Sequence, residues 1–498
     1  MRRFMKVLSL VTLSIMVIFS SFAFVACDGN KGAKKGEIYI MYFEGGFGSE
    51  WLINATERFS AKNPEVTFRL EKDADLSQNA PMLLQAGENL PDIIMSQDFN
   101  WMENVQNGDI ADLDDIYNRK VAEIDGQDVL LKDYISDEYK SYPWTPAIPG
   151  LPTKHAWIIP WSANTVSLAY NDDLLKKTQK SDGGYWTAPP TTTNELKNLV
   201  NDINTTSASG GYNSKQVKPF IWPGSAVNWL TFLQSTWWAQ YQGIADDYPQ
   251  GEGNWYSFWE FESPDVFLQQ GLIKSYDMLR DLFIDKQAQK WSNVPEGIGA
   301  LKTTEAEIEF VKGESVMMPV GSWLEKEMDN YLDASYAYPN MRENLRMMLL
   351  PNIEGARSTN INNAQVGDFM CVPEKAVNKD LAKEFLYFIS QEQEMLEFTK
   401  STGMMRPFKY NPVEQLPDHE WSVFQLDTIN MYLNNTNFYQ YSKNESPFFI
   451  FKKLTPYYPT ISTPIGGLLA SDGQTVAQGI YTSVNQLWDQ WKTELGMV

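Results

Sequence analysis

Apolar and polar residues alternate at the start of the region that follows residue 36. The segment 37–43, EIYIMYF, adds β-branched and aromatic side chains to this alternation, which predicts a β-strand. After a glycine-rich turn, Leu52, Ala55 and Phe59 recur at helical spacing behind Ser49, a residue type that caps helices. The pattern therefore predicts a strand, a turn and a helix in this order.

The same change of period follows twice more. Pro64 closes the first helix, and the segment VTFRLEK after it predicts a second strand. A short helix is expected over Met82–Ala86, ended by Gly87, and LPDIIMSQD at 90–98 predicts a third, buried strand. Strands that alternate with helices are typical of a mostly parallel sheet covered by helices.

Polar and aromatic residues follow the first and third strands. In parallel α/β sheets, ligands bind beyond the carboxyl ends of the strands. Glu44 lies at the first of these ends and Asp98 at the other, so both are candidates for a site. The chain has neither GxGxxG nor GxxxxGK[ST], and no nucleotide-binding loop is indicated.

Two long helices are expected further along the chain. The segment 263–283 is amphipathic, and 380–400 places Leu381, Phe385 and Phe388 on one face. Loops rich in Gly, Asn and Ser separate the elements between about residues 173 and 300.

The N-terminus has the pattern of an export signal. Basic residues precede an apolar run from Val7 to Phe24. Its length approaches that of a membrane-spanning helix, so a transmembrane anchor is the alternative. The sequence VAC ending at Cys27 resembles a bacterial lipobox, in which the cysteine is acylated, as with palmitate, and becomes the first mature residue. We predict a lipoprotein signal peptide over 1–26, lipid on Cys27 and a flexible tether over 27–36.

Length and charge restrict the class of protein. A chain of 498 residues exceeds one ordinary core and indicates at least two domains. A net charge of −22 repels nucleic acid and anionic lipid, so membrane attachment has to come from the acyl chain. Cys371, in an apolar stretch, is expected to be buried, with a Cys27–Cys371 disulfide as the alternative. Two cysteines and two distant histidines indicate no metal site, and no cofactor is expected.

Aromatic residues are abundant, with 17 Trp, 24 Tyr and 26 Phe. Many stand beside Gly, Asn, Asp or Pro, as in IPWSAN and FIWPGSAVNW. Such rings stack on the apolar face of a sugar while neighbouring amides and carboxylates bind its hydroxyl groups. The alternative, which is favoured for any single Trp, is that the ring packs in the core.

Several stretches, in their order along the chain, resemble the solute-binding proteins of bacterial ABC sugar importers (solute-binding family 1), which include the maltose-binding protein. They are LPDIIMSQD, NGDIADLDDI, IIPWSANTVSLAYNDDLLKK, PPTTTNELKNLVNDI, FVKGESVMMPVGSW, MLLPNIEG and DLAKEFLYFISQEQEMLEFTKSTGMMRPF. The resemblance implies an α/β, two-lobe periplasmic-binding-protein-like fold of class II, with a ligand cleft between lobes joined by hinge crossings.

The resemblance also places the crossings and the lobes. Crossings are expected near Pro160–Val166 and Ile361–Gly367. The N-terminal lobe is predicted to be 37–163 plus 366–415, and the C-terminal lobe 164–365 plus 416–498.

Site residues are carried over from the family by position. The turn after the first strand offers Glu44, Gly46 and Phe47, and the end of the third strand offers Asp98. Asn164 stands where the maltose-binding protein has an acid, and Trp323 after Gly-Ser matches a stacking platform. Position and chemistry add Asp368 and Trp222. Other residues that could serve equally are Trp161, Trp229 and Arg406.

The function implied is that of a non-enzymatic, monomeric receptor for a carbohydrate, which we expect to be an oligosaccharide. The receptor would deliver this ligand to ABC permease subunits in the membrane. It would be extracytoplasmic and anchored to the cell membrane through Cys27. The alternative is a secreted glycoside hydrolase or lyase that uses acidic residues such as Glu44 and Asp98. A third possibility keeps the fold but binds a peptide, a polyamine or a metal chelate.

Overall fold

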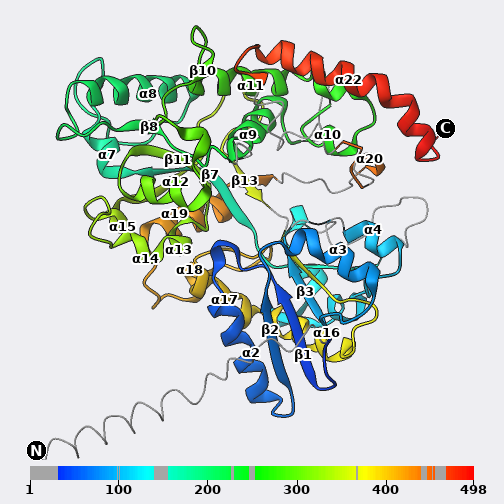
Figure 1. The fold of residues 1–498 in the computed structure, drawn as a ribbon. Coiled ribbons are helices and arrows are strands. Elements are labelled where there is room, and N and C mark those ends of the chain that lie inside the picture. The colour runs from blue at the N-terminus through cyan, green and yellow to red at the C-terminus, as the bar shows by residue number, and fades with distance from the viewer. Residues whose placement is uncertain are drawn as a thin grey trace, which may run out of the picture.

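The computed structural model describes residues 32–97, 99, 101–139, 155–225, 229–245, 253–365, 368–438, 446–450, 453–454 and 467–497. These residues form two lobes, one above the other in Figure 1. Each lobe contains its own β-sheet and hydrophobic core. The predicted signal peptide, Cys27 and most of the tether lie outside the described residues.

The first lobe is built on a five-stranded sheet in the order β2-β1-β3-β14-β6. Its strands are β1 (Glu37–Tyr42), β2 (Thr67–Lys72), β3 (Ile93–Ser96), β6 (Ile159–Pro160) and β14 (Phe369–Cys371). β1 is parallel to β2 and β3, whereas β14 is antiparallel to β3 and β6. The three strands and the parallel pairing predicted for residues 37–98 are confirmed.

Helices cover both faces of this sheet. Ile38 and Ile40 pack with α2 (Glu50–Lys62), α16 (Lys379–Ile389) and α17 (Glu392–Thr402). Tyr39 and Met41, on the opposite face, pack with α3 (Leu76–Ala86) and α4 (Trp101–Gln106). Alternate residues of one strand therefore supply two separate cores, which explains why EIYIMYF is apolar on both faces from Ile38 onward.

Three local predictions need correction. The helix expected from Met82 begins at Leu76 and includes Pro81, and it ends before Gly87, whose φ is 66°. Ser49 is the N-cap of α2 by position, but its hydroxyl donates to Glu44 instead of capping the helix. The single helix expected over 380–400 is interrupted at Ser390, whose hydroxyl donates to the carbonyl of Leu386.

The second lobe is built on a six-stranded sheet in the order β15-β13-β7-β11-β8, with β12 also paired to β7. Its strands are β7 (Asn164–Asn171), β8 (Lys218–Phe220), β11 (Ser315–Gly321), β12 (Leu345–Met348), β13 (Ile361–Gln365) and β15 (Thr436–Phe438). β7 is buried along its whole length and runs antiparallel to β11, β12 and β13. It is therefore the central strand of the lobe.

Helices of this lobe pack around that sheet, and the long C-terminal helix lies along α11 at the top of Figure 1. The main helices are α7 (Asp172–Lys177), α8 (Thr193–Ala208), α9 (Leu230–Gln242), α11 (Gln270–Phe283), α12 (Thr303–Val311), α19 (Val423–Asn434) and α22 (Gly473–Glu494). Shorter elements are α10 (Ser257–Glu260), η4 (Pro264–Leu268), β9 (Ile284–Asp285), β10 (Lys290–Trp291), η5 (Ile298–Ala300), α13 (Leu324–Glu327), α14 (Asp329–Leu332), α15 (Met341–Asn344) and α20 (Pro447–Ile450).

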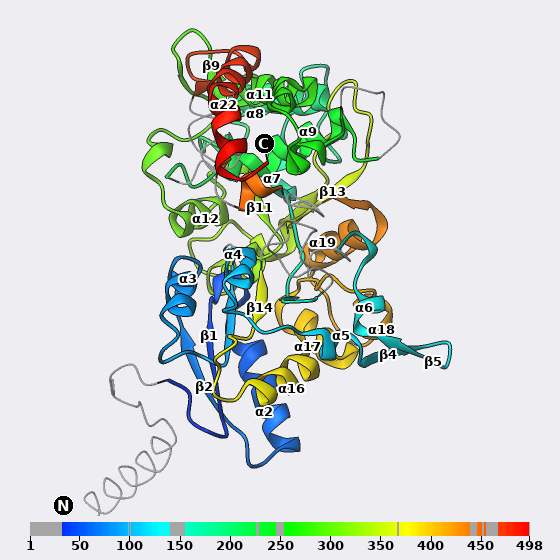
Figure 2. The same ribbon diagram turned by 90° about the vertical axis from the view of Figure 1, so that its right-hand side faces the viewer.

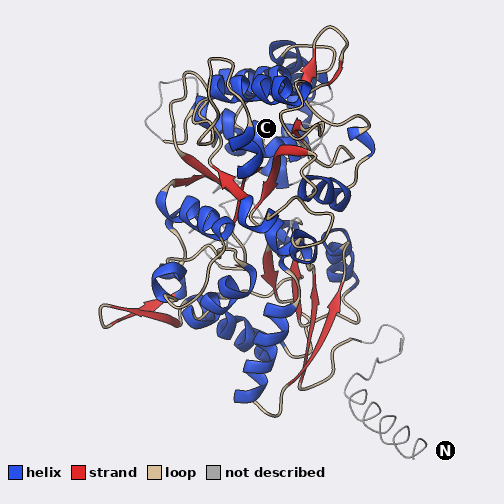
Figure 3. Cartoon of the chain, turned by 90° about the vertical axis from the view of Figure 1, so that its left-hand side faces the viewer, coloured by secondary structure: helices blue, strands red, loops and turns tan. Residues whose placement is uncertain are grey.

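A β-hairpin projects from the side of the first lobe (Figures 2 and 3). Its strands β4 (Lys120–Ile124) and β5 (Gln127–Leu130) are joined by Asp125 and Gly126, both with positive φ, as a tight two-residue turn requires. The remaining short elements of this lobe are η1 (Gly45–Phe47), α5 (Asp114–Tyr117), α6 (Leu131–Tyr134), η2 (Asp137–Tyr139) and α18 (Pro412–Gln415).

The chain passes between the two sheets more than once. It leaves β6 of the first sheet at residue 160 and enters β7 of the second at 164, and it returns between β13 and β14. The backbone N–H of Trp161 donates to the carbonyl of Asp368 at 3.1 Å, so the two crossings are bonded to each other. A third passage leads from α18 to α19, which packs on β12.

Within the described residues, no helix combines the length and the apolar character needed to cross a bilayer. Cys371 is fully buried in β14, as its apolar surroundings predicted, and it forms no disulfide within the described residues; Cys27, the alternative partner, lies outside them.

Candidate ligand-binding site between the lobes

Three buried polar side chains meet where the chain crosses between the sheets. Ser162 donates to Oδ2 of Asp368, and Nδ2 of Asn164 lies 3.3 Å from the same oxygen. Ser322, at the end of β11, reaches Oδ1 of Asn164 at 3.5 Å. The predicted residues Asn164 and Asp368 are therefore brought together, through partners that the sequence did not single out.

Trp323 follows β11 and stands directly before α13 (Leu324–Glu327). Its ring folds back over Gly321, where an ideal Cβ would lie only 2.0 Å from a ring carbon. Only glycine leaves space for this arrangement, which explains the spacing of GSW. The half-buried ring packs against the hydrophobic cores of both lobes.

Two rings from the start of α9 surround Trp323. The centroids of Trp229 and Phe232 both lie 6.1 Å from that of Trp323, at interplanar angles of 79° and 74°. These are edge-to-face contacts, which hold each ring in a defined orientation. We call Trp229, Phe232 and Trp323 the aromatic cluster.

The crossing and the aromatic cluster are linked through Asn363 of β13. Its Nδ2 donates to Oγ1 of Thr236 at 3.1 Å and to the carbonyl of Phe232 at 3.3 Å, both in α9. Its Oδ1 is buried and has no hydrogen-bond partner among the described residues. Sequence reasoning missed this residue, although consecutive asparagines in a predicted crossing are an unusual signal.

The first lobe meets the aromatic cluster through the turn η1. An ideal Cβ on Gly46 would lie 2.8 Å from Cβ of Trp323 and 3.1 Å from Oε2 of Glu327. Gly46 therefore permits a close approach of the two lobes that any side chain would obstruct. Phe47 points the other way and is buried against Trp161, with ring centroids 4.5 Å apart, so both rings anchor the turn in the first lobe.

Glu44 lies beside this turn but is already paired. Its carboxylate accepts bonds from Lys72, at 2.7 Å, and from Ser49. Burial acts to raise the pKa of Glu44, but these two hydrogen bonds outweigh it and hold the pKa below its ordinary value. Glu44 is thus an ionised acceptor with few free positions.

Two candidates lie apart from this arrangement, and a third falls outside the described residues. Trp222 is fully buried in the core of the second lobe, where its ring meets Phe283 and Trp291, so its faces are covered. Arg406 is fully buried in the first lobe; burial lowers its pKa to about 10, and its guanidinium donates to the carbonyl of Ile389. Asp98 lies outside the described residues.

Sequence reasoning also did not identify a pair of neighbouring carboxyl groups. Glu307 of α12 is completely buried, and its neighbour Glu327 of α13 is half-buried. Burial, followed by the charge of Glu327, raises the pKa of Glu307 to about 9. Burial also raises the pKa of Glu327, although a hydrogen bond from Glu307 opposes this. On sequence alone a Glu in an amphipathic helix predicts an exposed side chain, so the pair had no visible signal.

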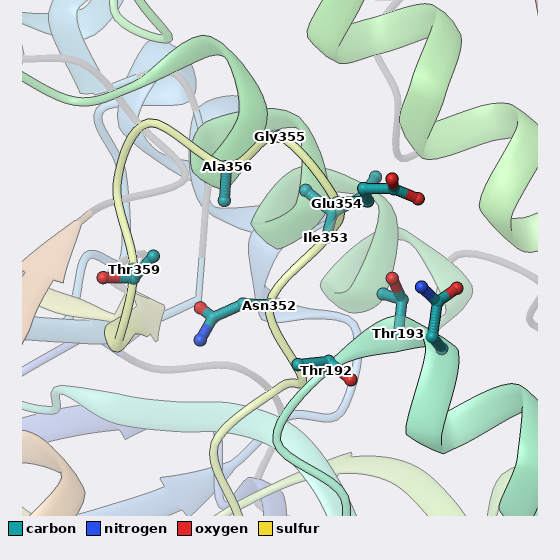
Figure 4. A pocket seen from close by; sticks show the side chains of 9 residues that line it. Thr192, Thr193, Asn352, Ile353, Glu354, Gly355, Ala356 and Thr359 are labelled. Carbon is teal, nitrogen blue, oxygen red and sulfur yellow. The ribbon is translucent and has the colours of Figure 1, made fainter.

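Two pockets lie away from the lobe crossing. One, of about 320 Å³, lies between the start of α8 and the loop after β12, and Figure 4 shows its lining residues, among them Thr192, Asn352 and Glu354. The helix start there is already satisfied by a capping box of Thr192 and Glu195. The other, of about 410 Å³, lies between α2 and α17. No predicted site residue lines either pocket.

The described residues also contain no group of three or more His, Cys, Asp or Glu side chains that could hold a metal ion.

Comparison with known proteins places these features in context. A family model described as bacterial extracellular solute-binding protein matches residues 54–443. A solved structure from work on xylan utilisation by the thermophilic bacterium Caldanaerobius polysaccharolyticus is similar in fold, with a TM-score of 0.64 and 15% sequence identity. The similarity covers 90% of this chain and 100% of that one. No curated protein matches the sequence.

Proposed function

Because the chain belongs to the bacterial extracellular solute-binding proteins, we propose that it is the receptor of an ABC importer and that it binds an oligosaccharide between its lobes. The lobes close on the sugar, and the closed form docks on permease subunits in the membrane. Binding selects the closed state from two states that the chain can adopt.

The arrangement of the aromatic cluster beside buried amide and carboxylate groups carries this proposal. Trp229, Phe232 and Trp323 place three rings beside one another in one lobe. Asn164 and Asp368 provide polar groups at the crossing, and Ser322, the neighbour of Trp323 in the chain, reaches Asn164. A pyranose has both kinds of surface, since its C–H groups stack on a ring while its hydroxyl groups bond to acceptors and amides.

The first lobe adds Gly46 and Glu44 to the proposed site. Gly46 gives the lobes their close contact, and Glu44 offers a carboxylate held ionised by Lys72. Asp98 is proposed as a further polar contact, by its position after β3. Trp222 is left out, because its ring is enclosed by the core.

Membrane attachment follows from the lipobox. We place the acyl chain on Cys27, which leaves the receptor outside the cytoplasm and tethered to the membrane that holds the permease. With a net charge of −22, the protein gains little from anionic lipid, so this single anchor has to supply the attachment.

The geometry of Glu44 disfavours the hydrolase alternative. A general acid for glycoside cleavage needs a raised pKa so that it still holds its proton near neutral pH. The hydrogen bonds from Lys72 and Ser49 act in the opposite direction on Glu44. A hydrolase would therefore need a different acid.

A thermal-shift screen tests the proposal. Xylobiose to xylotetraose come first, because the similar structure comes from work on xylan utilisation, followed by cello- and malto-oligosaccharides and their monosaccharides. One series should raise the midpoint of unfolding, since a ligand that binds only the folded state stabilises it by mass action. Spermidine and a dipeptide mixture serve as the comparison classes. A shift with one of these and none with any sugar contradicts the proposal, as does release of reducing sugar.

A further inference from the structure

Glu307 is an acid without a counter-charge at the base of the lobe contact. It is 0% exposed, and both carboxylate oxygens lack a hydrogen-bond donor among the described residues. Its acidic neighbour is Glu327, and a hydrogen bond between the two exists only when one of them carries a proton. Two carboxylates side by side, one of them fully buried, would repel strongly in such surroundings.

Among the described residues, no cation lies within hydrogen-bond reach of Glu307 to replace that proton. β11, against which α12 packs, has no ionisable side chain. The titratable groups on the other elements are Glu305 and Glu309 of α12, Glu325 and Lys326 of α13, Asp329 and Tyr331 of α14, and Glu44 and Glu50 beside η1. Lys326, the only cation among these, lies 3.7 Å from Glu50 of the first lobe. A proton is therefore the simplest way to neutralise the pair.

The turn η1 of the first lobe lies against Glu327. An ideal Cβ on Gly46 would lie 3.1 Å from Oε2 of Glu327, so the backbone of the turn η1 covers this carboxyl. α13 and η1 are the elements in contact at this point. When the lobes separate, this cover is removed and water can solvate the charge of Glu327.

We propose that the Glu307–Glu327 pair couples lobe closure to proton uptake, so that a lower pH favours the closed state. Closure removes water from Glu327 and makes its ionisation costly, and the pair then retains a proton. Opening restores the water, and the pair releases that proton. Because the closed state binds more protons than the open one, the ratio of closed to open protein falls as the pH rises between the two pKa values. The inference depends on lobe closure but not on the identity of the sugar.

Distance measurements on ligand-free protein test this coupling. Met82, 63% exposed on the first lobe, and Tyr185, 54% exposed on the second, are replaced with cysteine and spin-labelled in a Cys27→Ser background. Cys371 is fully buried and should not react. Pulsed electron–electron double resonance then gives the closed and open fractions from about pH 6 to about pH 9. Each unit of pKa difference between the two states should change their ratio by up to about tenfold.

Three variants locate the effect. Glu327→Gln should remove the pH dependence, because the pair then has one ionisable group that Gly46 does not cover. Glu325→Gln is the matched control: this carboxyl is buried in the same helix but accepts a bond from Ser422 at 2.8 Å, and it should behave as wild type. Gly46→Ala leaves every acid in place but obstructs the contact with Trp323, so it should stay open at all pH values.

A wild-type distribution that does not change with pH overturns the proposal. The same conclusion follows if Glu327→Gln or Gly46→Ala responds to pH as wild type does. Because no sugar is present, these outcomes are independent of whether the screen finds a ligand.

Discussion

Replacing Trp323 with alanine removes a ring that meets both lobes. Two edge-to-face contacts are lost, with Trp229 and Phe232 at centroid distances of 6.1 Å. Aromatic pairs contribute about 0.5–1.5 kcal/mol each beyond the area they bury, so the loss of two should lower the free energy of unfolding by about 1–3 kcal/mol. If the ring also stacks on sugar, binding should weaken by about 2 kcal/mol, roughly thirtyfold in Kd.

The two effects are measured separately. Denaturant titration of the sugar-free protein gives the stability, and isothermal titration with the oligosaccharide of largest thermal shift gives the affinity. Trp291→Ala is the matched control, because this half-buried ring packs on Trp222 in the second lobe, away from the crossing. It should lose stability while keeping its affinity.

A different outcome would refute the reasoning. If Trp323→Ala loses stability but the folded protein binds sugar as tightly as wild type, the ring supports the fold and the lobe contact but is not a platform. Trp323→Phe separates the size of the ring from the presence of any ring at this position. It keeps a smaller ring over Gly321 and should recover part of the affinity.

Other measurements test the remaining inferences. The pKa of Glu307 is raised to about 9 in the folded state, so its contribution to the free energy of unfolding is present below its unfolded pKa and is lost as the pH rises toward about 9. Wild type should therefore be less stable at high pH than near neutrality. Glu307→Gln should reduce this difference in urea titrations. Cys27→Ser should release the protein from washed membranes into the soluble fraction. If the variant stays on the membranes, a lipid anchor at this residue is excluded. Small-angle scattering should show a smaller radius of gyration once the bound oligosaccharide is added, whereas tight binding without compaction would indicate a rigid site. Asp368→Asn should weaken sugar binding about tenfold, since a hydrogen bond to a charged group contributes about 1.5–3 kcal/mol, and an unchanged Kd would exclude Asp368 from the site.

The elements of the first lobe could be predicted because each has one dominant period. In EIYIMYF successive apolar side chains point to opposite faces and enter two cores, as a strand covered by helices on both sides requires. The break at Ser390 could not be predicted, because apolar residues recur on both sides of it, Phe388 and Ile389 before it and Met395 and Leu396 after it.

The site was predicted only in part, for a related reason. A Trp close to Gly and Pro has similar sequence surroundings whether its ring lies at the lobe contact, as that of Trp323 does, or in a core, as that of Trp222 does. Polar residues are harder still. Asn363 is buried against residues more than a hundred positions away in the chain, and Glu307 is buried by neighbours on other elements. The periodicity of the local sequence carries no information about such neighbours.

The bond between the two crossings has a mechanical consequence. Two separate links between rigid bodies permit twisting and sliding as well as bending. Here the N–H of Trp161 donates to the carbonyl of Asp368, and the side chain of Ser162 donates to its carboxylate, so the links are fastened together. The backbone of Ala163 is also bonded to Met405, which ties the same point to the segment leading into the third passage. These bonds oppose twisting and sliding of one link past the other, so the proposed opening would be a rotation near residues 161–163 that separates Gly46 from Trp323.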